Sequence, residues 1–351
     1  MNPYVVALDV GGTTMKGGLV NSAGQVLLAD RRATPRDEGP LRVVEAIRTF
    51  IADLAQAGGG TPAGVGLAVP GLVTPDTAVY AANIGWKDVP AGDFTSLGVP
   101  VRLGHDVRTG GLAERVLGAG RAEPDFLFLS IGTGIAGAMI IRGEPYGGAS
   151  GWGGEIGHIA VFPDGERCAC GQIGCLETYA SAASVSRRHH DRQTRTASLR
   201  LATPDPTPMS DPTPMSDPAY RSAPRPVPVP VPVSAEDVVT LAMRGDSDAS
   251  IVWDEALEAL SIALASYTLL LDPSSIVLGG GLAEAGPALF EPLAERLAAR
   301  LTFRGAPPLR RAALGMNAGM LGAALLGWQA AGVPDPGATW ALDVLRSPAV
   351  P

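Results

Sequence analysis

The sequence has 351 residues, of which 46% are hydrophobic and 18% charged. A chain of this length can bury a large core and predicts two domains or lobes. The net charge of −8 argues against a protein that binds nucleic-acid phosphates or an anionic membrane surface. We therefore expect a small polar substrate, with no nucleic acid and no membrane as partner.

Cysteine use and the first residues predict a cytoplasmic protein. The three cysteines lie within residues 168–175, which excludes a disulfide framework. Asp9 interrupts the first apolar run, and no basic segment precedes that run, so we expect no secretory signal.

The uncharged stretch 312–334 has the length of a membrane helix. Its five glycines, with Asn317 and Gln329, favour a buried core helix.

The first hundred residues predict an antiparallel meander, a helix and a further strand. Three strand-like runs, at 4–8, 16–20 and 26–29, are separated by short turn sequences. Apolar residues then recur at helical spacing over 41–54, and three glycines end that helix before a strand at 65–69.

The same order begins again at Phe126, which predicts an internal duplication. Two strands are expected at 126–131 and 136–141, and a third around 159–162. The turn Gly132-Thr133-Gly134 then takes the place that Gly11-Gly12-Thr13 has in the first half. A chance similarity between two glycine-rich hairpins is the alternative.

Residues 190–233 interrupt the globular pattern. Eleven of the 31 prolines lie between Pro204 and Pro232, in a repeated hexapeptide and a run of alternating Pro and Val. This density excludes helix and interior strand, so we expect a disordered or polyproline II insertion that is dispensable, with partner binding as the alternative. His189 and His190 precede it in a basic run, which we interpret as a solvated face without a role.

Beyond the insertion the pattern again predicts regular structure. Ser234 is expected to cap a helix at 235–244 through the spacing Ser-x-x-Asp. A long helix over about 249–271 and a strand at 275–278 follow.

Glycine turns follow three of the expected strands, at 11–12, 132–134 and 279–281. Ligands of open sheets bind beyond the carboxyl ends of the strands, so the three turns are predicted to face one cleft. Glycines let backbone N–H groups approach phosphate oxygens, and Asp9 beside the first turn can hold a hydrated Mg²⁺. Together the turns favour a nucleotide cradle over three unrelated tight turns.

Asp106 follows the expected strand at 101–103 and begins a helical run. A carboxylate at that strand end can accept a proton from a sugar hydroxyl during phosphoryl transfer. A plain helix N-cap is the alternative.

A set of one histidine and three cysteines predicts a structural zinc site. His158, Cys168, Cys170 and Cys175 match the Cys₃His ligand set, in which four protein ligands leave no open position. Three unligated thiols are the alternative. The flanking Glu155 and Glu177 would be held near the metal, where both can accept hydrogen bonds from a polyol.

With these motifs in order, the chain resembles the ROK family of sugar kinases and sugar-responsive repressors, over about 1–188 and 234–330. The motifs that carry the resemblance are Asp9-x-Gly-Gly-Thr, Pro70-Gly71, Asn83-Ile84-Gly85-Trp86, Gly132-Thr133-Gly134, Glu155-Ile156-Gly157-His158, the segment from Cys168 to Glu177, and Gly279-Gly280-Gly281.

The resemblance implies an α/β, two-lobed, actin-like (ribonuclease H-like) ATPase fold with a duplicated βββαβα core and a structural zinc knuckle. The lobes would comprise residues 1–120 and 121–311, the second interrupted by the insertion. A helix at about 312–330 would pack back on the first lobe, and 331–351 would be a tail. The resemblance also implies a homo-oligomer, a dimer or a tetramer.

The implied activity is an ATP-dependent hexose kinase that phosphorylates the terminal hydroxyl of glucose or an N-acetylhexosamine. Asp106 resembles the family's general base, and His158 resembles a residue that serves both zinc and sugar. The implied sugar-binding residues are Gly71, Asn83, His105, Asp106, Glu155, His158 and Glu177. The implied ATP and Mg²⁺ residues are Asp9, Gly11, Gly12, Thr13, Gly132, Thr133 and Gly280.

Two alternatives and one departure remain. A sugar-responsive regulator would carry a helix-turn-helix before the ATPase motif, and Asp9 leaves no room for one. A catalytically silent sugar-binding protein is the other alternative.

The sequence departs from the family pattern at His105, where the family usually has Asn. An imidazole there can bond a sugar hydroxyl and gain a proton near neutral pH, which predicts sugar affinity that varies between about pH 5.5 and 7.5.

Overall fold

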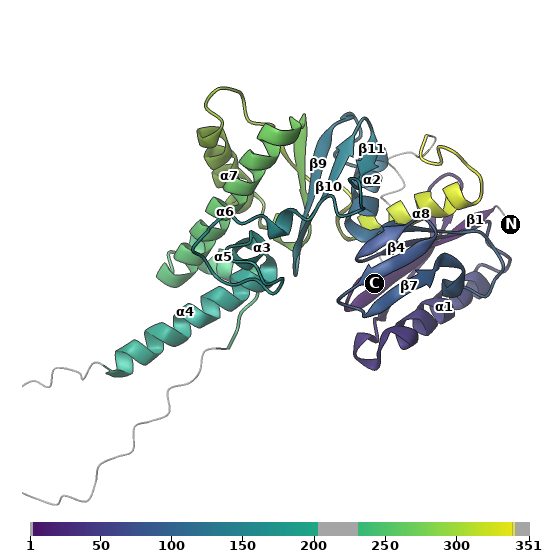
Figure 1. The fold of residues 1–351 in the computed structure, drawn as a ribbon, viewed down its shortest axis with the longest axis horizontal. Coiled ribbons are helices and arrows are strands. Elements are labelled where there is room, and N and C mark those ends of the chain that lie inside the picture. Colours follow the sequence, from purple (N-terminus) through teal and green to yellow (C-terminus); the bar gives the residue numbers. More distant parts are fainter. Residues whose placement is uncertain (1–2, 203–230, 339, 341–351) are drawn as a thin grey trace, which may run out of the picture.

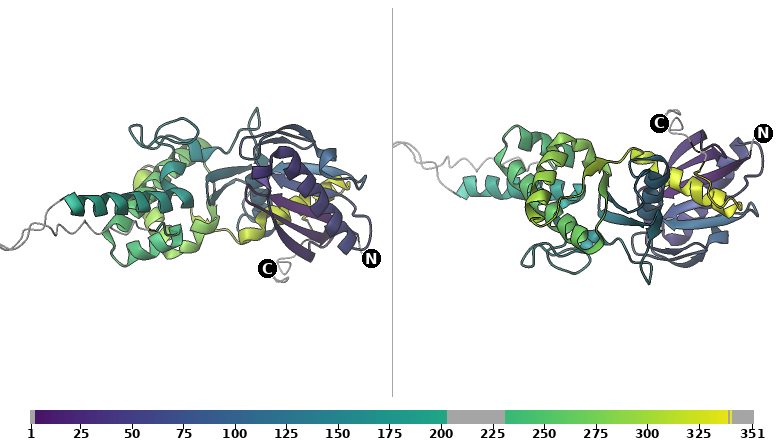
Figure 2. Two further views of the ribbon diagram at one scale, coloured as in Figure 1. Left: turned by 90° about the horizontal axis from the view of Figure 1, so that it is seen from below. Right: turned by 90° about the horizontal axis from the view of Figure 1, so that it is seen from above.

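The computed structural model describes residues 3–202, 231–338 and 340. These residues form two lobes that give the molecule an elongated shape (Figure 1, Figure 2). Each lobe is built on a five-stranded mixed sheet. Across the described residues, every helix is too short or too polar to span a membrane.

The sheet of the first lobe has the predicted meander on one side and parallel strands on the other. Its strands are β1 (Tyr4–Val10), β2 (Thr14–Asn21), β3 (Val26–Ala33), β4 (Val65–Val69) and β8 (Val101–His105). Their order is β3-β2-β1-β4-β8, with β1 parallel to β4 and β4 parallel to β8. The carboxyl ends of β1, β4 and β8 therefore lie at one edge, and Asp9 and Asp106 are placed there.

One helix and a small sheet complete this lobe. Helix α1 (Pro40–Ala57) buries an apolar stripe against the sheet and ends before Gly58. Between β4 and β8 the chain forms a three-stranded sheet of β5 (Leu72–Thr74), β6 (Thr77–Ala81) and β7 (Trp86–Pro90). Short 3₁₀ helices connect elements throughout the chain: η1 (Arg36–Glu38), η2 (Ala91–Phe94), η3 (Ile156–His158), η4 (Gly281–Ala285) and η5 (Gly315–Asn317).

The sheet of the second lobe repeats the first. Its strands are β9 (Phe126–Ile131), β10 (Ile135–Ile141), β11 (Glu144–Tyr146), β12 (Ser275–Gly279) and β13 (Leu309–Arg311), in the order β11-β10-β9-β12-β13. The antiparallel and parallel pairings match those of the first lobe, which confirms the internal duplication.

The third strand expected around residues 159–162 was wrong. The third strand of the repeat is β11, and the segment 159–162 contributes one isolated bridge, between Ala160 and Cys175. Residues 159–162 are drawn away from the sheet because they pair with the loop that carries the cysteines.

A group of five helices covers one face of the second sheet: α3 (Glu177–Ala180), α4 (Ala182–Ala202), α5 (Ala235–Met243), α6 (Ser247–Leu271) and α7 (Pro287–Arg300). Within this group, α4 packs on α3, α5 and α6. Strand β9 alternates, so that Leu127, Leu129 and Ile131 enter this helical core. The expected cap of α5 is confirmed, because Ser234 and Asp237 form a capping box.

Two helices lie at the junction of the lobes. Helix α8 (Ala318–Ala330) packs on β1, β4 and β8 of the first lobe although it comes from the far end of the sequence (Figure 2). Helix α2 (Asp106–Leu117) contacts α8 and also β10 of the second sheet. The fully buried Glu114 of α2 accepts backbone hydrogen bonds from Ala119, Ala313 and Leu314 at 2.8, 3.1 and 2.8 Å. The helix that begins at Asp106 is therefore held by both lobes.

Helix α4 corrects the expected start of the insertion at about residue 190. The helix continues to Ala202, and Arg192 pairs with Asp248 of α6 at 3.2 Å. His189 is fully buried, so the interpretation of a solvated face was wrong at this residue. Arg187, Arg188 and Arg192 of this run pair with carboxylates. The proline-rich residues 203–230 lie outside the described residues.

Removing the whole expected insertion should therefore lower stability. We expect a variant that joins His189 to Ser234 by a Gly/Ser linker to melt roughly 5 °C or more below the intact protein, because the end of α4 and its pairing with Asp248 are lost. A matched variant that keeps α4 and replaces 203–230 should melt within about 2 °C of the intact protein. Calorimetry compares them, and equal melting temperatures would contradict a stabilising role for the end of α4.

Candidate active site

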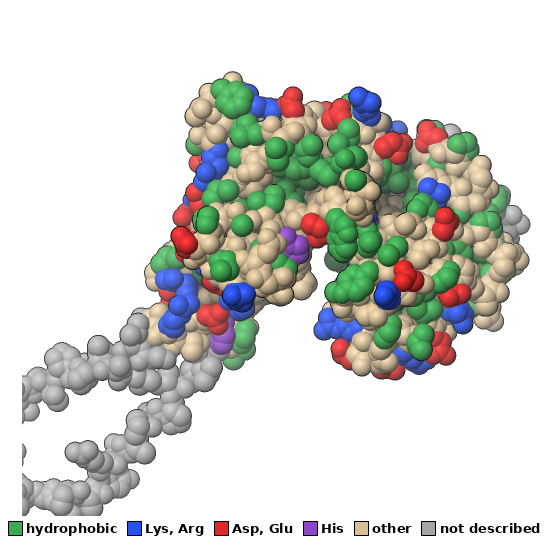
Figure 3. Space-filling model, viewed as in Figure 1, with side chains coloured by type: hydrophobic (Ala, Val, Ile, Leu, Met, Phe, Trp, Pro, Cys, Tyr) green, Lys and Arg blue, Asp and Glu red, His purple; other side chains and the backbone are tan. Residues whose placement is uncertain are grey.

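A cavity of about 580 Å³ opens between the lobes, where strand ends of both sheets meet. Figure 3 shows the hollow between the two lobes. Nine of the residues that were expected to bind the sugar or the nucleotide line it: Gly71, Asn83, His105, Asp106, Gly132, Thr133, Glu155, His158 and Glu177. The structure therefore brings together residues that lie more than a hundred positions apart in the chain.

Asp106 is the first residue of α2 and lies on the wall of this cavity. Its Oδ1 accepts a hydrogen bond from the backbone N–H of Val107 at 2.7 Å, and 30% of the side chain is exposed. Burial, with the nearby charge of Asp9, raises the pKa of Asp106 to about 7. Such a carboxylate can take up or release a proton near neutral pH.

His105, not Asp106, is the N-cap residue of α2. Its Nδ1 lies 3.5 Å from the backbone nitrogen of Arg108 and 3.2 Å from Oδ1 of Asp106. Burial, together with the charge of Arg108, lowers the pKa of His105 to about 3. The expectation that this imidazole gains a proton near neutral pH was therefore wrong, because the buried cap position favours the neutral ring.

Asp9 and the β1–β2 turn lie beside the cavity and do not line it. Burial raises the pKa of Asp9, and the charge of Lys16 opposes that shift. A Cβ on Gly319 of α8 would come within 2.4 Å of the Asp9 carboxylate, so a glycine leaves room for it. A Cβ on Gly12 would lie 3.4 Å from the Asn83 amide nitrogen. Gly11 and Thr13 belong to the same turn, in which the Gly11 N–H donates to the Thr14 carbonyl at 2.9 Å.

Of the three glycine turns, the one at 132–134 lines the cavity. Glu177 fixes this turn, because its Oε2 accepts the backbone N–H of Ile135 at 2.8 Å. Gly280 lies against the end of β9, where a Cβ would come within 2.4 Å of the Ile131 carbonyl oxygen. Its φ of 81° is a second reason why only glycine fits there.

The four expected zinc ligands come together on one side of the cavity. Their ligand atoms all lie within 4.8 Å of one another, with 3.7 Å between the sulfurs of Cys170 and Cys175. The Nδ1 of His158 is 3.9 Å from the sulfur of Cys168. A tetrahedral zinc with Zn–S bonds of about 2.3 Å places two sulfurs roughly 3.8 Å apart, so the donor set fits that ion. The Nε2 of His158 faces Glu155 at 3.9 Å.

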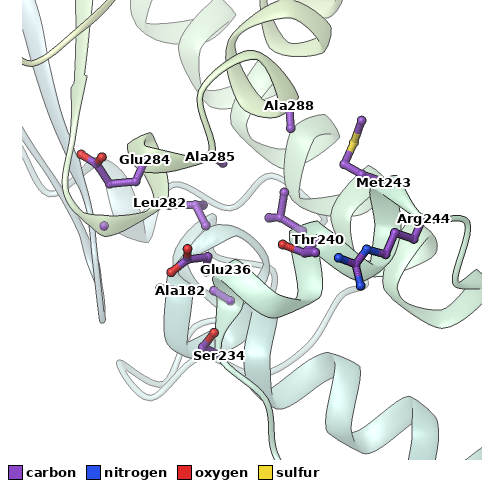
Figure 4. A pocket seen from close by; sticks show the side chains of 13 residues that line it. Ala182, Ser234, Glu236, Thr240, Met243, Arg244, Leu282, Glu284, Ala285 and Ala288 are labelled. Atoms are coloured by element: carbon purple, nitrogen blue, oxygen red, sulfur yellow. The ribbon is translucent and has the colours of Figure 1, made fainter.

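A second cavity, of about 540 Å³, lies in the second lobe (Figure 4). Apolar residues of η4 and α5 form most of its wall. Its polar groups belong to Ser234, Glu236, Thr240, Arg244 and Glu284. Ala182 also lines it and donates its N–H to the Gly132 carbonyl at 2.8 Å, which connects this cavity to the glycine turn of the cleft. An apolar cavity with a few polar groups is typical of small-molecule sites.

Two aromatic residues of the cleft escaped the sequence analysis. Tyr80 and Trp152 line the same cavity as Asp106 and are 47% and 51% exposed. For Trp152 the sequence did carry a signal, since a tryptophan in a glycine-rich segment such as 147–154 rarely enters a core and is therefore a candidate ligand contact.

The two-lobed fold with duplicated mixed sheets, and a carboxylate-lined cleft between them, is that of the actin-like sugar kinases. The sequence matches the ROK family over residues 5–330. The chain belongs to the ROK family.

Named relatives cover nearly the whole chain. A glucokinase of Halalkalibacterium halodurans is 31% identical over 93% of this chain and 94% of its own length. An N-acetyl-D-glucosamine kinase of Erwinia tasmaniensis is 30% identical over 91% and 97%. The crystal structure of a ROK family glucokinase from Streptomyces griseus in complex with glucose and AMPPNP is similar with a TM-score of 0.73. It is 28% identical and covers 93% of this chain and 99% of that one.

Proposed function

We propose that this sugar kinase transfers the terminal phosphoryl group of ATP to the terminal hydroxyl of a hexose, either glucose or an N-acetylhexosamine. The observation that carries the proposal is the position of Asp106, a carboxylate with a pKa near 7 that shares one cavity with the glycine turn 132–134. Relatives that cover nearly the whole chain support it, since they are named for glucose and N-acetyl-D-glucosamine.

Asp106 is the proposed general base. Its ionised carboxylate accepts the proton of the sugar hydroxyl as that oxygen attacks the phosphorus, and the bond to the leaving ADP oxygen breaks. Both lobes contact α2, which carries this carboxylate, so the base stays at a fixed position in the cleft. Phosphoryl transfer depends mainly on positioning and charge neutralisation, which makes that rigidity useful.

The remaining cleft residues are proposed to hold the sugar. The carboxylates of Glu155 and Glu177 accept hydrogen bonds from ring hydroxyls, and His158 presents Nε2 on the same wall. Asn83 and Gly71 form the wall opposite, from the first lobe. His105 is neutral, so it contributes a hydrogen bond and no charge.

The nucleotide is proposed to extend from the cleft toward the second cavity. Gly132 and Thr133 would contact its phosphates, and Gly280 would allow the adenosine to pass toward the cavity beside η4. The residues of the first turn, Gly11, Gly12 and Thr13, would contact the phosphates from the other lobe, and Asp9 would hold Mg²⁺. Its hard carboxylate oxygens suit this ion, which neutralises phosphate charge when bound.

Zinc is proposed as a structural ion held by His158, Cys168, Cys170 and Cys175. Four protein ligands leave no position for a reacting water, so the ion would stabilise the loop that carries Glu155 and Glu177. The geometry of the four ligand atoms supports this role.

The experiment for the proposed function is ADP release from the full chain over a panel of sugars. We expect release with ATP and Mg²⁺ in the presence of glucose or one of the N-acetylhexosamines, N-acetylglucosamine and N-acetylmannosamine. Mannose and fructose complete the panel. ADP release that is equal with and without every sugar would contradict a hexose kinase.

The proposed base also predicts how activity depends on pH. Burial raises the pKa of Asp106 to about 7, so the ionised base is lost as the pH falls through 7, and kcat/KM should fall with it. A His105→Asn variant should keep the midpoint of this acid limb within about half a pH unit, because the pKa of His105 is lowered to about 3. The two midpoints are obtained by measuring kcat/KM between pH 5 and 9 for the intact protein and for the variant. A midpoint that moves by a full unit in the variant would mean that the imidazole titrates there.

A further inference from the structure

Trp152 differs from the other tryptophans of the chain in its exposure. The sequence has five tryptophans. Trp86, Trp253, Trp328 and Trp340 are buried, with 1–5% of their surface exposed, whereas Trp152 is 51% exposed. Trp152 lines the cleft between the lobes, close to residues proposed to bind the sugar. A large apolar ring left open to this cleft favours contact with a ligand over a role in the core.

The backbone on both sides of Trp152 is held in place. The guanidinium of Arg108 donates from one nitrogen, Nη1, to the carbonyl of Gly151 at 2.9 Å and to that of Gly153 at 3.1 Å. Further along the loop, Gly153 donates its N–H to the carbonyl of Gly147, and the Gly154 carbonyl accepts from Gly137 of β10, both at 2.8 Å. The exposed ring therefore projects from a fixed loop.

Arg108 connects this loop to the proposed base. It lies on α2, two residues after Asp106, so one rigid helix positions both the carboxylate and the two peptide groups that flank Trp152. The carboxylate of Asp106 and the backbone on both sides of Trp152 are thus positioned by the same helix.

The surroundings of Trp152 match the two kinds of surface on a pyranose. Glu155, His158 and Glu177 offer polar atoms for hydroxyl groups, and Tyr80 approaches from the first lobe. A pyranose has hydroxyl groups around its rim and C–H groups on its faces, and a flat aromatic ring is suited to cover such a face.

We propose that Trp152 is a sugar-binding residue on which the C–H face of the pyranose packs, and that Arg108 is the positioning residue that holds this platform. The inference rests on the proposed function, because it assumes that a hexose binds in the cleft. It adds a binding contribution that is separate from proton transfer at Asp106.

Contact with the ring face is the same before and during phosphoryl transfer, so its loss should raise KM and leave kcat unchanged. We expect Trp152→Ala to raise the hexose KM and Kd roughly tenfold, and Trp152→Phe to stay within about threefold of the intact protein, since a flat ring remains. Phe303→Ala is the matched control, because it removes an aromatic side chain that is 80% exposed and lies outside the cleft.

Arg108 gives a second test through a double-mutant cycle. If Arg108 acts on the sugar through Trp152, Arg108→Ala should raise the hexose Kd, and the double variant Arg108→Ala, Trp152→Ala should be no weaker than Trp152→Ala within about twofold. Independent, additive losses would contradict the positioning role of Arg108.

Tryptophan fluorescence without ATP provides the direct readout, because the other four rings are buried. Hexose binding should protect the intact protein from quenching by acrylamide, and this protection should vanish in Trp152→Phe while calorimetry still detects binding. If hexose binds with unchanged quenching and Trp152→Ala binds it equally well, the platform is refuted. If calorimetry detects no binding of any hexose to the intact protein, the proposed function itself fails.

Discussion

Asp106→Asn is expected to lower the turnover of the proposed reaction by roughly a hundredfold or more, the usual contribution of a general base. The amide keeps the size of the side chain and its ability to form hydrogen bonds, but it cannot accept the hydroxyl proton at neutral pH. Sugar affinity should therefore stay within a few-fold of the intact protein. Steady-state kinetics and calorimetry measure the two effects separately.

Asp93→Asn is a suitable control for this experiment, because Asp93 is an exposed residue of η2 outside the cavity. It should leave both turnover and affinity unchanged. Turnover of Asp106→Asn close to that of the control would place the base at another residue.

Cys170→Ser is expected to lose zinc, to melt roughly 10 °C or more below the intact protein, and to bind hexose less tightly. The three effects should occur together because His158 contacts the cysteine cluster through Nδ1 and lies 3.9 Å from Glu155 through Nε2. Loss of the ion would free the segment that carries Glu155, His158 and the cysteines. Elemental analysis, calorimetry and a sugar titration measure the three effects.

Ala169→Ser is the matched control, since it places the same hydroxyl on a neighbouring exposed residue of the loop. It should keep full zinc content and normal binding. A full complement of zinc in Cys170→Ser would contradict the assignment of this cysteine as a ligand.

The parts of the fold that could be predicted are those whose pattern is local. Apolar runs and glycine turns predicted the three strands of the first meander and the first two of the second, and the spacing of Ser234 and Asp237 predicted the start of α5. Strand β11 was missed because its three residues, Glu-Pro-Tyr, carry no alternating pattern. It is a strand because β10 pairs with it.

Helix α4 shows why charge patterns alone mislead. Arg188 belongs to a run that looks solvated, yet it is 11% exposed and pairs with Glu166 at 2.8 Å and with Glu255 at 2.7 Å. Its guanidinium also lies over the ring of Tyr179. These partners come from three separate elements, so no local pattern in the sequence indicates the burial.

In the candidate site, too, some features could be predicted from the sequence and others could not. Asp106 could be found because it follows a strand, and the zinc ligands because they are clustered in sequence. The neutral state of His105 depends on burial and on Arg108, and the open position of Trp152 depends on hydrogen bonds to its loop from another element. Both properties come from tertiary contacts and were therefore not predictable from spacing.

The most direct test of a hexose kinase that acts on the terminal hydroxyl is the proton-coupled ³¹P spectrum of the product formed from ATP, Mg²⁺ and the preferred hexose. Transfer to the terminal CH₂OH group predicts a new phosphomonoester signal split into a triplet by two protons, and its absence from the same mixture with Asp106→Asn. A doublet, which indicates a phosphate on a ring carbon with one proton, or the release of inorganic phosphate alone would contradict the account.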